Sequence, residues 1–301
     1  MKAMCQGFDA IRSGSAQTII AGGMESMTQS PYLSGDARGG ARLGHRQLID
    51  HMFLDGLQDA YEEGALMGVF AERCATKYQL TREVQDAYAL TSLSRAITAQ
   101  DTDAFDREIA PVSVTHKGQT RLVLQDEQPQ QARPDKIPLL KPAFAKGGTV
   151  TAANASSISD GAAALVLVSR ALAEANDMPI RAKIAGWAAH AHDPDWFTTA
   201  PIPATQSLLD RLGWTARDVD LWEVNEAFAV VPMVFMQQLG VPHEKLNVNG
   251  GACALGHPIG ASGARIVVTL LHAMEARDLK RGIAAICIGG GEGLAIAIER
   301  D

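Results

Sequence analysis

One histidine of this chain lies in a stretch that is rich in glycine. Residues 249–263 read NGGACALGHPIGASG, which places His257 between a predicted short strand and a predicted long helix. Glycine lets the backbone approach a bound molecule closely and adopt positive φ angles. An imidazole titrates near neutral pH, so this one is suited to moving a proton to or from a ligand. The stretch therefore predicts an acid–base residue that faces a substrate.

A cysteine occupies a similar setting about thirty residues later. Residues 287–293 read CIGGGEG, so Cys287 ends a predicted apolar strand and precedes a run of glycines. A histidine loop together with such a strand end indicates acid–base chemistry on a carbonyl compound. Taken alone, Cys287 would more simply be a packed thiol, and His257 could equally well be a loop cap.

The composition is that of a soluble globular protein without a strong attraction to polyanions. Of the 301 residues, 47% are hydrophobic and 20% charged, and the formal net charge is −7 with no basic block. Nucleic acid and anionic membranes are therefore not expected as main partners, whereas a phosphate-bearing ligand can still bind locally. No apolar run is long enough to span a membrane, and the first residues do not form a signal peptide.

The cysteines and histidines do not suggest a metal or a disulfide framework. The four cysteines are scattered without a C-x-x-C pair, so a reducing cytoplasm is the expected location. His190 and His192 are spaced i, i+2, but no third ligand for a metal pair is evident. We expect no metal site.

The elements that must position His257 and Cys287 alternate between helix and strand. After residue 157 the predicted elements are strands over 160–169, from Ile180, and over 219–224, 245–249, 283–288 and 293–299, and helices over 204–212, 226–239 and 261–276. Such alternation is typical of a layered α/β domain around a largely buried sheet.

The preceding part of the chain has a different texture. A helix over 2–13 and a strand over 17–21 come first. The elements expected next are polar helices over 51–63, 68–78 and 81 to about 100, a hairpin of 111–116 and 119–124, and a Pro/Gln-rich connector over 128–138. This stretch resembles an insertion more than a β–α–β unit.

A weak internal repeat links the two ends of the chain. Helix, strand and Gly-Gly-Met-Glu in residues 2–25 parallel helix, strand and Gly-Gly-Gly-Glu in residues 262–292. The second copy has a strand and a glycine-rich loop ahead of its helix, whereas the first copy does not. We therefore expect the first half to be incomplete.

Six separate motifs resemble those of the thiolases, which include acetyl-CoA acetyltransferases and 3-ketoacyl-CoA thiolases. Besides the two stretches quoted above, they are AGGMESM over 21–27, LKPAF over 140–144, GTVTAANAS over 148–156 and NEAFA over 225–229. The resemblance runs from end to end and follows the family's order. It implies a thiolase-like α/β fold of two related layered halves with an inserted loop domain. On this basis residues 1–29 and 158–178 are the remnant of the N-terminal half, 30–157 the loop domain, and 179–301 the C-terminal half.

The resemblance also implies acyl transfer between an acyl-CoA and acetyl-CoA, by thiolysis of a 3-ketoacyl-CoA or by the reverse Claisen condensation. His257 would take the proton from the nucleophile, and Cys287 would protonate or deprotonate the acetyl-CoA methyl carbon. A water held by Asn225 and the N–H of Gly289 would stabilise oxyanions, each donor typically contributing about 3 kcal/mol. Taken alone, Asn225 would more simply be the N-cap of helix 226–239.

Coenzyme A thioesters are then the expected substrates, with no permanently bound cofactor, and a homodimer or homotetramer is the expected assembly. The residues that the resemblance places around coenzyme A are Met67, Phe144, Ala152, Ser156, Ala227 and Phe228, with Arg133 near the adenine end.

The departure from the family concerns the nucleophile. Thiolases carry it in a Cys-Gly-Ser-Gly turn at the start of a helix, and residues 1–4 match the positions that follow this turn. Cys5 is a poor substitute, because it would lie about two turns, or ~12 Å, along that helix. We therefore expect a chain that is truncated at its front and inactive as a thiolase. A non-catalytic CoA-binding or scaffold protein is the alternative.

Overall fold

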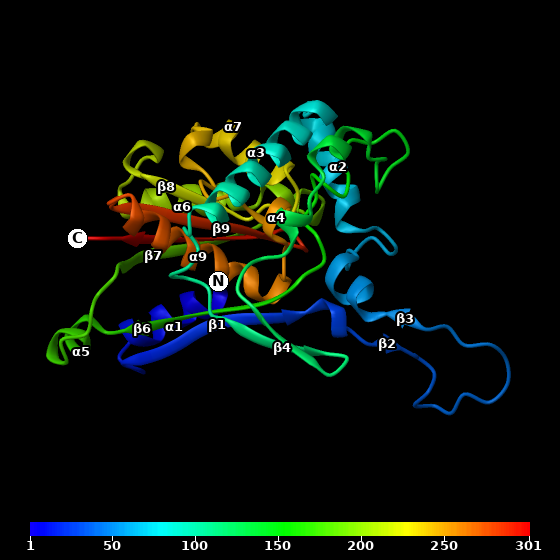
Figure 1. The fold of residues 1–301 in the computed structure, drawn as a ribbon, viewed down its shortest axis with the longest axis horizontal. Helices are drawn as coiled ribbons and strands as arrows, with labels where there is room; N and C mark the ends of the chain where they lie inside the picture. The colour runs from blue at the N-terminus through cyan, green and yellow to red at the C-terminus, as the bar shows by residue number, and fades with distance from the viewer.

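Two β-sheets with helices between them organise the molecule (Figure 1). The computed structural model describes all 301 residues except the side chain of His116. The main sheet has the order β7-β10-β9-β8. Its strands are β7 (Lys183–Ala191), β8 (Leu221–Val224), β9 (Arg281–Ile288) and β10 (Glu292–Glu299). Strands β8 and β9 are parallel, and the other two pairs are antiparallel.

The second sheet consists of β1 (Thr18–Ser26) and β6 (Asp160–Val168), which pair antiparallel along their whole length. Helices α1 (Lys2–Arg12) and α9 (Ile259–Ala276) lie between the sheets, and α9 contacts β1 and β6 on one side and β8 and β9 on the other. In Figure 1 this second sheet runs along the lower edge of the molecule. Its outward face is apolar and exposed at Ile20, Met24 and Val166.

The main sheet is buried on both faces. One cluster packs Trp222, Val224 and Phe235 beneath α6 (Pro201–Leu212) and α7 (Val230–Leu239). The other packs Ile286 and Leu270, among others, between the sheet and α9. Burial on both faces explains why β9 and β10 are nearly continuous apolar runs and do not alternate with polar residues.

The remaining elements lie in the connections. Between β1 and β6 they are η1 (Met27–Gln29), β2 (Tyr32–Leu33), β3 (Ile49–Asp50), η2 (Met52–Leu57), α2 (Met67–Lys77), α3 (Arg82–Asp101), β4 (Val112–His116), β5 (Gln119–Val123), α4 (Gln128–Gln131) and η3 (Pro134–Leu139). After β6 they are α5 (Arg170–Ala175), η4 (Pro194–Thr199), η5 (Ala216–Asp218), η6 (His243–Lys245) and α8 (Ala252–Leu255).

Several local predictions are confirmed. Helix α3 begins after Thr81, whose hydroxyl accepts the Val84 N–H at 3.4 Å. The β4–β5 hairpin turns at Lys117 and Gly118, both with positive φ (49° and 78°), the backbone of a two-residue turn that matches strand twist.

None of the helices in the described residues is both long and apolar enough to cross a membrane.

The helix predicted over 51–63 is only partly confirmed. The chain forms the short π-helix η2 over Met52–Leu57 and then an isolated bridge between Gln58 and Leu66. The Asp59 carboxylate accepts the N–H groups of Tyr61 and Glu62 at 2.8 and 2.7 Å. A side chain that bonds nearby backbone in this way competes with the helical hydrogen bonds.

The strand predicted over 245–249 is wrong. Only an isolated parallel bridge joins Leu246 to Trp222, because Asn247 adopts a φ of 48°. Its side-chain amide replaces backbone pairing, accepting the Val224 N–H and donating to the Val224 carbonyl, both at 2.8 Å. Strand β1, in contrast, continues to Ser26, beyond the predicted end at residue 21.

Candidate active site

Asn225 and Cys287 meet at one end of the main sheet because β8 and β9 run parallel. Asn225 directly follows β8, and its backbone N–H donates to the carbonyl of Ala285 in β9 at 3.0 Å. Cys287 stands two residues further along β9. The carboxyl ends of parallel strands are the usual place for ligand sites in α/β sheets. The fold thus brings two of the predicted catalytic residues to one edge.

His257 joins them through Asn225. The Asn225 side-chain nitrogen lies 3.4 Å from Nε2 of His257. On the other side of the ring, Nδ1 lies 2.5 Å from Oγ of Ser262, and that hydroxyl donates to the Pro258 carbonyl at 3.0 Å. With the single hydroxyl proton of Ser262 directed at that carbonyl, Nδ1–H is the donor to Oγ. Nε2 then carries the lone pair, the form needed by a general base.

Hydrogen bonds hold the loop that carries His257 on both sides. Its N–H donates to the carbonyl of Ser157 at 3.3 Å. Just beyond it, the Gly260 N–H donates to the Glu25 carboxylate at 3.2 Å. Gly23 faces the same turn so closely that an added Cβ would lie 1.9 Å from the Gly260 carbonyl oxygen. Strand β1 therefore fixes where α9 begins.

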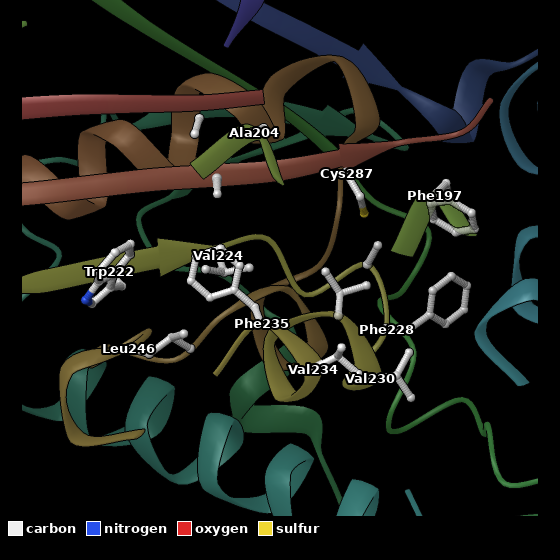
Figure 2. Packing of buried hydrophobic residues seen from close by; sticks show 14 of the residues in the cluster. Phe197, Ala204, Trp222, Val224, Phe228, Val230, Val234, Phe235, Leu246 and Cys287 are labelled. Atoms are coloured by element: carbon white, nitrogen blue, oxygen red, sulfur yellow. The ribbon is translucent and has the colours of Figure 1, made fainter. Parts of the chain in front are cut away.

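Cys287 is a buried, protonated thiol. Its side chain is 6% exposed, and burial raises its pKa to about 12. Figure 2 shows the sulfur directed away from the sheet, toward the segment that carries Phe228 and Val230. A thiol with so high a pKa holds its proton firmly, so it is suited to donating that proton to a strongly basic carbon.

Asn225 does not cap a helix. Helix α7 begins at Val230, so the N-cap interpretation of Asn225 is wrong. The intervening residues are held against β-type partners, since Phe228 bridges Ala155 and the Ala227 carbonyl accepts the Ser156 N–H. Asn225 is fully buried, and its Oδ1 has no hydrogen-bond partner. Such an orphan acceptor indicates a site for a bound water or ligand donor.

Most residues predicted to contact coenzyme A form one apolar group beside this edge. The Ser156 hydroxyl donates to the Ala227 carbonyl at 3.0 Å. The rings of Phe144 and Phe228 pack edge to face with centroids 6.0 Å apart. Met67 lies on the backbone of Gly289, where an added Cβ would be 3.2 Å from its sulfur.

Two predicted ligand-binding residues lie outside this group. Ala152 is exposed. Arg133 is also exposed, and its only recorded partner among the described residues is Asp135, at 4.0 Å.

The other three cysteines are placed for packing. Cys5 is completely buried in the cluster beside α9, and burial raises its pKa to about 11. Cys74 is buried in the opposite cluster, and the Cys253 thiol contacts two backbone carbonyls. No group of three or more potential metal ligands occurs among the described residues.

The imidazole of His257 is held neutral. Burial, and then the positive charge of Arg265, lower its pKa from 6.5 to about 4. The unfolded chain consequently binds more protons at this position between pH 6.5 and 4. The stability that this group contributes is complete above pH 6.5 and is lost as the pH falls toward 4.

We expect this loss to appear as a difference between the native chain and a His257→Gln variant. Over the fall from pH 7 to 4.5, the native chain should lose about 2 kcal/mol of unfolding free energy relative to the variant. The difference is the quantity to measure, by denaturant titration. Burial raises the pKa of Glu223 to about 8 and of Glu108 to about 7, which gives slopes of opposite sign in both proteins. A pH-independent difference would contradict the prediction.

Ser262→Ala tests the tautomer. The variant lacks the acceptor for Nδ1–H, so we expect the ¹⁵N resonances of His257 to change from one Nδ1–H form to a mixture of both tautomers. Ser159→Ala is the control, since Ser159 contacts the preceding turn at Gly256 and not the ring. A mixture already present in the native chain would refute the assignment.

Sequence reasoning missed three residues that support this site. Ser262 orients the imidazole, Glu25 holds the first turn of α9, and the buried Glu226 accepts hydrogen bonds from the loop before His257. A signal for Ser262 existed, because a serine one turn into the helix after His-Pro can reach back to the ring. Glu25 offered none, since its partner lies 235 positions away.

Comparison with known proteins gives the site a family context. The family model for the thiolase N-terminal domain matches residues 1–171, and that for the thiolase C-terminal domain matches residues 178–300. An acetyl-CoA acetyltransferase of Pseudomonas aeruginosa is 48% identical over 303 residues, which cover 100% of this chain and 77% of that protein. An acetyl-CoA acetyltransferase of Escherichia coli K12 is also 48% identical, over 302 residues covering 100% of this chain and 76% of that protein.

Solved structures of similar proteins have the same fold as this chain. The acetyl-CoA acetyltransferase of Bacillus anthracis superposes with a TM-score of 0.95 at 38% identity, over 99% of this chain and 76% of that one. The Acat5 thiolase of Ascaris suum, solved in complex with coenzyme A, gives 0.93 at 43% identity, over 100% of this chain and 76% of that one. The predicted thiolase-like α/β fold is confirmed, and the chain belongs to the thiolase family.

Proposed function

We propose that the chain supplies the acid–base and oxyanion groups for acyl transfer between an acyl-CoA and acetyl-CoA, in the direction of thiolysis or of Claisen condensation, whereas none of its own four cysteines is the attacking thiol. His257, Asn225, Cys287 and the Gly289 N–H carry the chemistry. The observation that supports this most directly is the pair formed by Asn225 and His257. The Asn225 amide lies 3.4 Å from the Nε2 lone pair, while its own Oδ1 is buried and unpartnered.

His257 acts as the base toward a thiol nucleophile. Because it is neutral with Nε2 unprotonated, it can accept the proton released when a thiol attacks the substrate carbonyl. The unpartnered Oδ1 of Asn225 holds a water, whose remaining hydrogen points at the thioester oxygen. A donor in that position stabilises the negative charge that develops on the oxygen.

Cys287 transfers the proton to and from the methyl carbon of acetyl-CoA. In thiolysis the bond between Cα and Cβ breaks, and its electron pair goes to the acetyl-CoA carbanion. The Cys287 thiol protonates that carbon and becomes a thiolate. In condensation the thiolate removes a methyl proton from acetyl-CoA, and the carbanion attacks the acyl carbonyl. A pKa of about 12 makes this thiol a better match for a carbon acid than an ordinary cysteine.

Coenzyme A thioesters are the substrates, with no resident cofactor. Support comes from the Ascaris suum neighbour, whose structure contains coenzyme A. It also comes from the apolar group of Phe144, Phe228 and Met67, which lies beside the end of the main sheet that carries Asn225 and Cys287, called here the reactive edge. Ser156 and Ala227 complete this wall, whereas Ala152 and Arg133 lie exposed outside it and would contact only the part of coenzyme A that extends beyond the wall.

Two measurements on the chain as it stands test the proposal. Calorimetry should detect binding of coenzyme A, and acetyl-CoA incubated in D₂O should gain deuterium in its methyl group at a rate lost in Cys287→Ala. Binding without Cys287-dependent exchange would favour the non-catalytic CoA-binding alternative. Absence of both would contradict the proposal.

The proposal extends to assembly and location. A homodimer or homotetramer would cover exposed apolar surface such as Ile20, Met24 and Val166. Light scattering measures the molar mass of the assembly in solution and so tests this. The four cysteines are all free, which suits the reducing cytoplasm.

A further inference from the structure

Glu226 is a charged side chain buried next to the reactive edge and not used by the chemistry above. It directly follows Asn225 and is completely buried. Its carboxylate has four hydrogen-bond partners and no cation among them. One oxygen accepts from the Tyr88 hydroxyl and the Asn247 amide, both at 2.8 Å. The other accepts from the Ser92 hydroxyl at 2.7 Å and the Cys253 N–H at 3.0 Å.

These partners come from two separate parts of the chain. Tyr88 and Ser92 lie one turn apart on α3, whereas Asn247 and Cys253 belong to residues 247–257, the segment that leads to His257 and includes the short helix α8 (called here the histidine loop). Ser92 adds a second link, because its Oγ also accepts the Gly251 N–H at 2.9 Å. Gly251 itself lies against the carboxyl group, with 2.3 Å between an added Cβ and the carboxyl carbon. Helix α3 and the histidine loop are therefore joined through one side chain.

The four partners fill the acceptor positions of Glu226. Each presents an N–H or O–H group to a carboxylate with about four acceptor positions, so none of these positions is left without a donor. Hydrogen bonds to a charged acceptor are about twice as strong as neutral ones, which suits a clamp between two segments.

We propose that Glu226 is a positioning residue for acyl transfer, which holds the loop of residues 247–257 against α3 and so keeps the His257 ring at Asn225. This inference rests on the proposed function for its catalytic meaning. The link is short: Glu226 is adjacent to Asn225, and its partner Cys253 lies four residues before His257. Loss of the clamp frees the loop on one side while β1 still holds the other.

Glu226→Gln tests the clamp in the intact chain. The glutamine amide keeps one acceptor oxygen but turns an NH₂ group toward two of the four donors. We expect amide hydrogen exchange in residues 249–257 to accelerate at least about tenfold, while exchange in β9 and β10 stays unchanged. The ¹⁵N resonances of His257 should change from a single Nδ1–H form to a mixture of tautomers, which records a displaced ring.

Glu223→Gln is the matched control. Glu223 lies on β8, three residues before Glu226, and is 2% exposed, but its charged partner is Arg265, at 3.7 Å, and not the histidine loop. Its substitution should leave exchange in residues 249–257 unchanged. If both variants loosen the loop equally, or if Glu226→Gln accelerates exchange throughout the protein, Glu226 is merely structural and the inference is overturned.

Ser92→Ala covers the case in which Glu226→Gln does not fold. This small change removes one donor to Glu226 and the acceptor of Gly251, so exchange at Gly251 should accelerate selectively. Unchanged exchange there would also overturn the inference. These readouts need no thiolysis, so a failed coenzyme A or deuterium experiment would refute the proposed function while leaving the clamp intact.

Discussion

The purified chain, mixed with acetoacetyl-CoA and coenzyme A, is expected to release acetyl-CoA no faster than a buffer blank. Thiolysis needs an accessible thiolate, and burial raises the pKa of all four cysteine thiols. Cys5 is completely buried with a pKa raised to about 11, and Cys287 is 6% exposed with a pKa raised to about 12. A concerted catalytic set without a working nucleophile is slower by roughly 10⁶-fold. A spectrophotometric assay of the thioester enolate measures the result.

Cys5→Ser provides the control for this prediction. If the native chain does turn over, and the activity disappears in Cys5→Ser but persists in Cys74→Ser, Cys5 is the nucleophile. The expected result is instead that all three proteins are equally inactive while the binding of coenzyme A is retained.

The largest loss of stability is expected for Trp222→Ala. Trp222 is 1% exposed, lies in the core beneath α7, and packs edge to face on Phe235 with ring centroids 5.6 Å apart. Figure 2 shows the two rings next to one another on the left of the drawn cluster, with Leu246 below them. Truncation leaves a cavity that the neighbouring β8 backbone cannot close, so we expect a loss of about 3–5 kcal/mol in unfolding free energy.

Trp222→Phe separates packing from hydrogen bonding at this position. The indole N–H of Trp222 is buried without a partner, and phenylalanine removes it along with part of the ring. The smaller volume lost and the relief of an unsatisfied donor should limit the cost to a fraction of that of alanine. Equal losses for the two variants in urea titrations would show that the cavity is not the cause.

The reactive edge was predictable because its residues sit in short motifs with local causes. The glycines around His257 and after Cys287 predicted tight turns, and the neighbouring apolar runs predicted strands. The hairpin at Lys117 and Gly118 followed from turn chemistry in the same way. In each case the signal and the structure lie within a few residues of one another.

The misplaced elements have longer-range causes. Asn247 forms strand-like hydrogen bonds with its side chain, so an apolar run beside it is not a strand. The N-cap interpretation of Asn225 assumed a helix that begins at residue 226. The bridge between Ala155 and Phe228 holds this segment out of the helix, so α7 begins only at Val230. The clamp at Glu226 joins groups more than a hundred positions apart, and no spacing along the chain reveals such a partner. The domain boundaries at residues 29, 157 and 178 stay a prediction.

The near-contact of Gly23 with Gly260 restricts how this protein can evolve. The orientation of the turn after His257 depends on direct contact between the backbones of Gly23 and Gly260. A methyl group added at Gly23 would meet the Gly260 carbonyl, and no change of side-chain rotamer would make room for it. Among functional descendants, position 23 should tolerate no residue but glycine, while Ile20, three positions upstream, drifts freely among apolar types.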